Sequence, residues 1–183
     1  MIPLYLDPAQ ARIALIGRAA LALRRLEWLR QGGAVPEIWS DEPSEAFAAA
    51  ALGLRRRLPR LADLASYHAV WIADLPYEKA EALANAARSV QTIVNVEDAP
   101  SLCDFHTPAV VRRGKLTLSA GTGGASPAVA RAARERLQAA FPDTWSEALD
   151  EIAQSRAALR GLGAGADALV ADARARLRQH RLT

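Results

Sequence analysis

The fold is decided by the stretch Arg12-Ile-Ala-Leu-Ile-Gly17, a short apolar run that ends at a glycine. An apolar run of this length is typical of a strand buried on both faces of a parallel sheet. Downstream, Leu21, Leu26 and Leu29 recur at helical spacing as far as Gly32-Gly33, where we expect the helix to end. The order of strand, glycine and helix predicts the first unit of an α/β domain.

The same alternation continues along the chain. Further strands are predicted at residues 36–40, 69–73 and 92–96, and helices after Ser44 and over residues 77–88. Strands that alternate with helices in this way favour a parallel sheet with right-handed crossovers. The chain is therefore predicted to be an α/β protein with a Rossmann-like parallel sheet, to which residues 115–119 would add a fifth strand.

From residue 119 onward the pattern is helical. Ser126-Pro127 is a typical helix start, with serine as the cap and proline in the first turn. Pro142 ends that helix, and Gly161-Leu-Gly-Ala-Gly165 divides the remainder into two more. These helices are too few to form a core, so we expect them to pack against the sheet domain or a second copy of the chain. We divide the chain into a Rossmann-like domain over residues 1–118 and a helical region over residues 119–183.

Composition argues against several classes of protein. The net charge of +3 permits an anionic ligand, but the basic residues are interleaved with acidic ones and form no nucleic-acid footprint. The single cysteine, Cys103, excludes an internal disulfide framework, and no second histidine lies at ligand spacing from His106, so we expect no resident metal site. No apolar run approaches the roughly 18 residues of a membrane span. We expect a cytoplasmic protein that binds neither nucleic acid nor membranes.

Two further stretches carry the functional prediction. They are Asn95-Val-Glu-Asp98, at the end of the fourth predicted strand, and Thr122-Gly-Gly-Ala-Ser-Pro127, ahead of a helix. With the residues between them, they closely resemble the precorrin-2 dehydrogenase / sirohydrochlorin ferrochelatase family, the N-terminal module of siroheme synthases. The resemblance covers roughly residues 1–142. It implies that NAD binds to residues 1–118, that the substrate is a tetrapyrrole, and that the helical tail joins two copies into a homodimer.

Asp98 is the candidate catalytic residue. Open α/β sheets place their ligands at the carboxyl ends of the strands, where Asp98 is predicted to lie. The resemblance implies that this aspartate is a general base, which takes the proton that precorrin-2 loses when a hydride passes to NAD. In members that insert iron, the same group is implied in removing pyrrole N–H protons. On spacing alone, Glu97-Asp98-Ala-Pro100 also fits an ordinary turn at the end of a strand.

The nucleotide loop is only half preserved. A dinucleotide fingerprint has glycine at its first and third positions and a small residue at its sixth, so that the backbone can approach the pyrophosphate. The stretch Gly17-Arg-Ala19-Ala-Leu-Ala22 has Ala19 in place of the middle glycine, which predicts weaker binding. Arg18 could compensate by its charge or occupy the phosphate site itself. The predicted cofactor residues are Gly17, Ala19, Ala20, Leu21, Asp41 and Glu42, the last two for the ribose hydroxyls.

Two observations leave cofactor binding open at this stage. Strand, glycine and helix in this order begin any parallel sheet domain, with or without a nucleotide. In addition, Ala73-Asp-Leu-Pro76 stands where the resembling family has an Ala-Thr run. The altered nucleotide loop and this altered stretch both lie on the cofactor side. They affect the prediction of NAD more than that of the tetrapyrrole.

The stretch Thr122-Gly-Gly-Ala-Ser-Pro127 predicts a binding site for the carboxylate groups of a tetrapyrrole. Glycines ahead of a capped helix expose backbone N–H groups that suit such anions, although a flexible entry loop to the helix is equally compatible with them. The predicted substrate residues are Asn95, Arg113, Thr122, Gly123, Gly124 and Ser126.

The sequence as a whole predicts an NAD-dependent precorrin-2 dehydrogenase that makes sirohydrochlorin. Ferrochelatase activity, with Fe²⁺ or Co²⁺ as the inserted metal, is a further expectation. Two alternatives stay open: a chelatase that has lost the dehydrogenase step together with its cofactor loop, and a non-catalytic protein that binds a tetrapyrrole.

Overall fold

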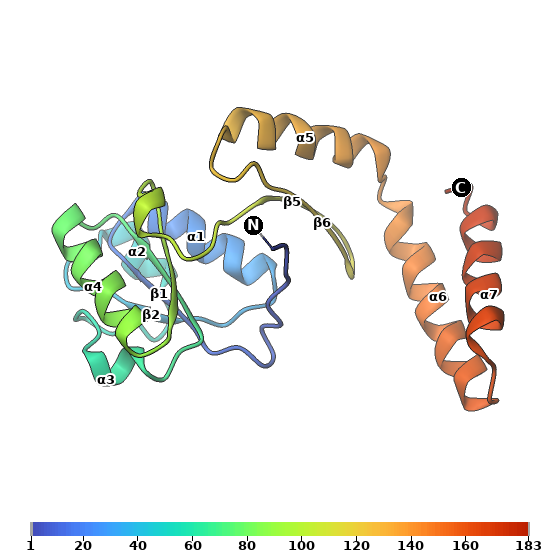
Figure 1. Ribbon diagram of the computed structural model, residues 1–183, viewed down its shortest axis with the longest axis horizontal. Helices are drawn as coiled ribbons and strands as arrows, with labels where there is room; N and C mark the ends of the chain where they lie inside the picture. The colour runs from blue at the N-terminus through green and yellow to red at the C-terminus, as the bar shows by residue number, and fades with distance from the viewer. Residues whose placement is uncertain (1, 183) are drawn as a thin grey trace. The chain divides into compact units, whose positions relative to one another are not determined.

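The computed structural model describes residues 2–182 and contains a four-stranded parallel sheet. Its strands are β1 (Ile13–Gly17), β2 (Glu37–Trp39), β3 (Ala69–Ala73) and β4 (Ile93–Val96). They are arranged in the order β2-β1-β3-β4, and every neighbouring pair is parallel. Figure 1 labels β1 and β2 among the surrounding helices. The predicted Rossmann-like sheet is therefore confirmed.

Helices cover both faces of this sheet. They are α1 (Ala20–Gln31), α2 (Glu45–Ala50), α3 (Leu61–Leu64) and α4 (Tyr77–Ser89), followed after β4 by a short 3-10 helix, η1 (Pro100–Leu102). Alternate residues of a strand point to opposite faces. Ile13 and Leu15 of β1 accordingly pack with α1 and α2, whereas Ala14 and Ile16 pack with α3 and α4. Strands β1 and β3 carry no polar side chain and are buried along their whole length, because helices cover both of their faces.

The ends of the helices follow from local chemistry. Ser44 caps α2, with its hydroxyl accepting a hydrogen bond from the Phe47 amide at 3.3 Å. Helix α1 ends at Gln31 with Gly32 as its C-cap, and Gly33 then adopts a φ of +83°, a conformation that glycine reaches without steric cost. Both boundaries agree with the sequence prediction. The short helix α3 was not predicted, because four residues are too few to show a helical period.

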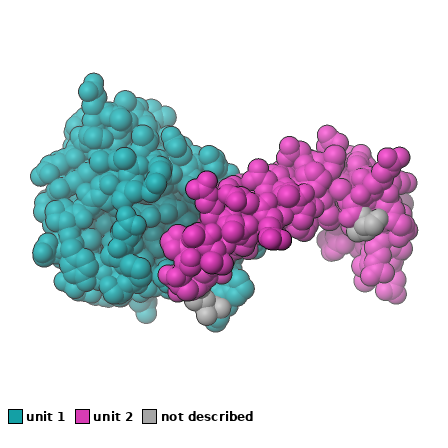
Figure 2. Space-filling model, turned by 90° about the horizontal axis from the view of Figure 1, so that it is seen from above, with its two compact units in different colours: residues 1–107 teal, residues 108–183 magenta. Residues whose placement is uncertain are grey.

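The chain divides into two compact units, residues 1–107 and residues 108–183, which Figure 2 colours separately. The second unit begins with an antiparallel hairpin of β5 (Ala109–Arg113) and β6 (Leu116–Ala120). The prediction of a fifth strand in the parallel sheet was wrong: this strand exists, but it pairs with β5. Gly114, with a φ of +55°, and Lys115 form a two-residue loop, and so short a connection joins only antiparallel strands. The whole hairpin lies in the second unit, whereas the predicted boundary at residue 118 placed β5 and most of β6 in the first domain.

Three helices complete the second unit: α5 (Pro127–Ala140), α6 (Thr144–Gly161) and α7 (Ala166–Gln179). Ser126 caps α5 and accepts a hydrogen bond from the Val129 amide at 3.3 Å, as the Ser-Pro pair predicts. Helices α6 and α7 pack side by side, as the labels in Figure 1 show. The described residues of this unit bury only three hydrophobic side chains, Val111, Ala148 and Leu169. In residues 2–182, no helix is both long and apolar enough to cross a membrane.

Candidate cofactor and catalytic site

The carboxyl edge of the parallel sheet gathers most of the polar residues that the sequence singled out. The strands β1, β3 and β4 end at Gly17, Ala73 and Val96, and each is followed by a charged residue. Since the strand order runs from β2 through β1 to β3, the chain reverses direction across the sheet between β1 and β3. In open α/β sheets this point forms the crevice where ligands bind.

Gly17 is required by the close approach of α1 to the sheet. A Cβ atom at this position would collide with the Cβ of Ala22 and would lie 3.0 Å from the carbonyl oxygen of Ala73. Neither neighbour is a flexible side chain, because one belongs to the first turn of α1 and the other to the end of β3. Ala20 and Leu21 lie in that same first turn, so the structure brings these predicted cofactor residues together at the start of α1.

The start of α1 is occupied by a carboxylate that the sequence prediction missed. Asp74 Oδ2 accepts hydrogen bonds from the backbone amides of Ala19, at 3.0 Å, and Ala22, at 2.8 Å. Ala19 is the N-cap residue of α1 and has no side-chain oxygen of its own. The backbone of Asp74 has a φ of +58°, which is uncommon for a residue other than glycine. Asp74 therefore takes over the capping of a helix that lies 52 residues earlier in the chain.

Arg18 is paired with the two acidic residues predicted to bind the ribose. Its guanidinium donates to both carboxylate oxygens of Asp41, at 2.8 and 2.7 Å, and lies 3.0 Å from Glu42. Lys79 Nζ also lies 3.1 Å from Asp41 Oδ2. The hydrogen bonds from Arg18 hold the pKa of Asp41 well below its usual range. Arg18, Asp41 and Glu42 thus form one ion-pair cluster, as sequence alone could not show.

The turn after β1 and the acidic residues after β2, at the carboxyl edge of the sheet, fit a dinucleotide. Gly17 gives the tight turn between strand and helix, and Asp41 and Glu42 follow β2, where an acidic residue usually contacts the ribose. The backbone amides of Ala19 and Ala22, which would face a pyrophosphate, already have a partner in Asp74. NAD(P) would therefore be held by the first turn of α1 and the acidic pair, and its phosphates would meet the Asp74 carboxylate.

Asp98 lies two residues beyond the end of β4, on the same edge. Its side chain is exposed and has no hydrogen-bond or ion-pair partner within residues 2–182. Its backbone has a φ of +59°, in the left-handed region that Asp tolerates better than most residues. The preceding residue, Glu97, forms a largely buried ion pair with Arg25 of α1. This pair links the loop that carries Asp98 to α1, while the Asp98 carboxylate itself is left exposed.

Asn95 and the residues after η1 hold the loop that carries Asp98 through hydrogen bonds within the first unit. The Asn95 amide is buried and donates to the carbonyl oxygen of Phe105 at 2.8 Å. Asp104 accepts from the Val94 amide at 2.9 Å and from Arg88 at 2.7 Å. The Sγ of Cys103 lies 3.2 Å from the Val96 amide, and burial raises the pKa of this thiol. The structure thus uses Asn95 within the domain, to hold the loop that carries Asp98.

The other predicted substrate residues lie in the second unit. Thr122 closes a small turn, with its hydroxyl 3.2 Å from both the amide and the carbonyl oxygen of Ser126. Gly123 and Gly124 inside this turn have positive φ and are exposed. Arg113 is 14% exposed and donates to the carbonyl oxygens of Gln138 and Phe141, at the end of α5. Arg113 therefore holds the C-terminus of α5, whereas the glycine turn is open to solvent.

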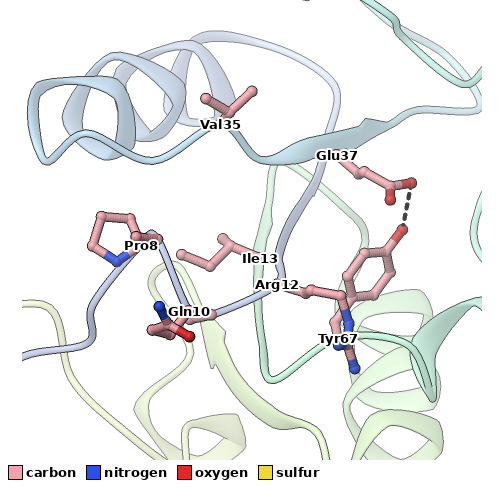
Figure 3. A pocket seen from close by; sticks show the side chains of 9 residues that line it. Pro8, Gln10, Arg12, Ile13, Val35, Glu37 and Tyr67 are labelled. Carbon is pink, nitrogen blue, oxygen red and sulfur yellow. Dashed lines mark hydrogen bonds between the residues drawn. The ribbon is translucent and has the colours of Figure 1, made fainter.

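The first unit also contains a cavity of about 260 Å³ at the opposite, amino edge of the sheet. Figure 3 shows its lining, in which Tyr67 donates a hydrogen bond to Glu37 at 2.8 Å. Its residues come from the starts of the strands, so this cavity is separate from the carboxyl edge.

No cluster of three or more His, Cys, Asp or Glu side chains that could hold a metal occurs within the described residues 2–182.

Comparison with known proteins agrees with this architecture. A family model described as "Putative NAD(P)-binding" matches residues 4–109. The siroheme synthase of Thiobacillus denitrificans is 31% identical over 150 residues, which cover 79% of this chain and 31% of that protein. The siroheme synthase of Pseudomonas putida strain W619 is 32% identical over 166 residues, covering 88% of this chain and 36% of that protein. The chain thus spans about a third of the length of these curated relatives.

A solved structure shares the fold of the whole chain. The structure described as SirC, precorrin-2 dehydrogenase, aligns with a TM-score of 0.69 at 19% identity and covers 100% of both chains. The family match supports NAD(P) as the cofactor, in agreement with the sequence prediction.

Proposed function

This chain belongs to the NAD(P)-binding family that includes the N-terminal module of siroheme synthases, and from this premise we propose that it is an NAD-dependent precorrin-2 dehydrogenase. The product of this reaction would be sirohydrochlorin. The observation that carries the proposal is Asp98, an exposed carboxylate without a partner in residues 2–182, at the carboxyl end of β4. Its place on the sheet is where α/β enzymes of this class bind their ligands.

Asp98 would act as the general base. Oxidation of precorrin-2 to sirohydrochlorin removes a hydride and a proton, and bound NAD supplies the hydride acceptor. The Asp98 carboxylate would take the proton, for which an ionised and accessible oxygen is required. The ion pair of Glu97 with Arg25 and the hydrogen bond of Asn95 to Phe105 would keep that oxygen in place.

A ferrochelatase activity is the second proposal for the same residue. Metal insertion into sirohydrochlorin releases two pyrrole N–H protons, and Asp98 would accept them while Fe²⁺ or Co²⁺ enters as a substrate. The absence of a metal-ligand cluster in residues 2–182 is compatible with a metal that is a substrate and passes through the site.

Absorbance spectroscopy would test both activities. The purified chain is mixed with precorrin-2, with and without NAD, and the formation of sirohydrochlorin is followed. We expect NAD-dependent product from the natural chain and from Glu81→Gln, a change of an exposed carboxylate on α4, and no product from Asp98→Asn. Product formation by Asp98→Asn at the natural rate would refute the role of Asp98.

Sirohydrochlorin incubated with Fe²⁺ in the absence of NAD then separates the two proposals. Iron insertion that is lost in Asp98→Asn supports the chelatase. A chain that inserts iron but never oxidises precorrin-2 would be a chelatase without a dehydrogenase step.

We also propose that the second unit pairs with a second copy of itself. Helix α5 has no buried residue, and Val129 on this helix is 59% exposed. A unit that buries so few side chains gains little stability from its own core, and a symmetric partner would cover its apolar surface. Light scattering coupled to gel filtration should give twice the chain mass, and Val129→Glu should reduce it to the mass of one chain.

A further inference from the structure

Helix α1 is capped by a side chain from another part of the sheet. Asp74, directly after β3, places one carboxylate oxygen 3.0 Å from the Ala19 amide and 2.8 Å from the Ala22 amide. These amides are at the positive end of a 12-residue helix, where an anion is stabilised both by hydrogen bonds and by the helix dipole. The carboxylate of Asp74 therefore occupies the position on α1 that suits a phosphate group.

The backbone of Asp74 adopts an uncommon conformation at the residue that makes these two hydrogen bonds. With a φ of +58°, Asp74 is in the left-handed region that most residues avoid. The contact forms at the boundary of β1 and β3, where a ligand crevice is expected in this fold. It is thus an internal carboxylate contact in the region that a dinucleotide would enter.

The charges around this contact also oppose a pyrophosphate. Arg18, the cation nearest to the loop in sequence, is held by Asp41 and Glu42. Lys79 is paired with Asp41 as well. The cluster together with Asp74 places three carboxylates against two cations, so neither cation of the cluster is available to neutralise an incoming phosphate without losing a partner.

We propose that Asp74 sets the affinity of this site for dinucleotides, by competing with the cofactor pyrophosphate for the amides of Ala19 and Ala22. The inference rests on the proposed NAD dependence and deepens it. Binding of the pyrophosphate requires the carboxylate to leave the start of α1, and the free energy of its two charge-assisted hydrogen bonds is subtracted from that of binding.

Two variants separate the charge of Asp74 from its hydrogen bonds. Asp74→Asn keeps an oxygen that can accept from both amides and removes the negative charge. Asp74→Gly removes the side chain and tolerates the positive φ. The matched control is Asp63→Asn, because Asp63 also accepts from a backbone amide at a helix start, that of Arg60 at 2.7 Å, but at the start of α3.

Isothermal titration calorimetry would measure the dissociation constants of NAD⁺, ADP-ribose and adenosine. We expect Asp74→Gly to bind NAD⁺ and ADP-ribose at least about tenfold more tightly than the natural chain, which corresponds to about 1.4 kcal/mol. Asp74→Asn, which keeps neutral hydrogen bonds to the two amides, should show a smaller gain. Adenosine lacks the pyrophosphate, so its affinity should not change. Asp63→Asn should bind all three ligands as the natural chain does, and circular dichroism should show that each variant is folded.

The outcomes distinguish this inference from the proposed function. If the natural chain binds NAD⁺ and the Asp74 variants bind it equally or more weakly, the inference is refuted and the cofactor assignment stands. If only the variants bind NAD⁺, the inference is supported and the NAD dependence of the natural chain is refuted. If no protein binds NAD⁺ at millimolar concentration, both are refuted. Asp74→Gly decides the matter if Asp74→Asn does not fold.

Discussion

Replacement of Gly17 by alanine tests the packing on which the carboxyl edge depends. The added Cβ would collide with the Cβ of Ala22 and lie 3.0 Å from the carbonyl oxygen of Ala73. Both neighbours belong to the framework of the domain, so relief requires α1 to move away from the sheet. Overpacking of this kind costs about 1–3 kcal/mol, and we expect a value of about 2–3 kcal/mol because neither neighbour can rotate away.

A second substitution identifies the source of this cost. Ala22→Gly removes the methyl group with which the new Cβ collides, but by itself lowers helix stability by about 1 kcal/mol. If the collision is real, Gly17→Ala combined with Ala22→Gly should lose clearly less than the sum of the two single losses. Gly121→Ala is the matched control, because a Cβ there meets no atom within 4 Å.

Urea unfolding followed by tryptophan fluorescence measures these changes, since Trp39 and Trp71 are buried in the first unit. The expected order of unfolding free energies is natural chain and Gly121→Ala highest, the double variant intermediate and Gly17→Ala lowest. A loss below about 0.5 kcal/mol for Gly17→Ala, or single losses that simply add in the double variant, would contradict the packing argument.

Two further predictions concern buried polar groups. Burial, together with the hydrogen bond to Glu37, raises the pKa of Tyr67 to about 12, so the folded state keeps the phenol neutral at a pH where the unfolded chain ionises. Stability should therefore be lost as the pH rises from about 10 to about 12, and Tyr67→Phe should flatten this loss in urea titrations at successive pH values. The hydroxyl of Ser40 is buried without a hydrogen-bond partner in residues 2–182, so Ser40→Ala should leave the unfolding free energy unchanged or raise it by up to about 1 kcal/mol. Thr92→Val should instead lower it by about 1–2 kcal/mol, because Thr92 Oγ1 lies 2.9 Å from the carbonyl oxygens of Leu64 and Tyr67; equal effects of the two substitutions would refute this reasoning.

Much of the first unit could be predicted from the sequence because its signals are local. The apolar run that ends at Gly17 and the helix after Ser44 depend only on nearby residues, and the structure confirms them. The Ser126 cap in the second unit was predicted for the same reason. The hairpin of β5 and β6 was missed, although the two-residue loop at Gly114 is a usable signal for it. Strand length alone does not distinguish a fifth parallel strand from one arm of a hairpin.

Part of the candidate site could be located from the sequence, but Asp74 and the contacts within the site could not. The sequence placed Asp98, Gly17 and the acidic pair at strand ends, and parallel strands bring such ends to one edge of the sheet. It could not show that Asn95 points inward to Phe105, or that Arg113 holds the end of α5. Those roles depend on which loops pack together.

The sequence by itself determined the strand, glycine and helix order, the presence of Ala19 in the nucleotide loop, and the family to which the chain belongs. Only the tertiary structure decided what lies on the first turn of α1. Because β3 is the neighbour of β1, it brings Asp74 to the amides of Ala19 and Ala22, across a sequence separation of more than 50 residues. A carboxylate there competes for the same hydrogen-bond donors as a pyrophosphate, so cofactor affinity depends on a contact that no local pattern encodes.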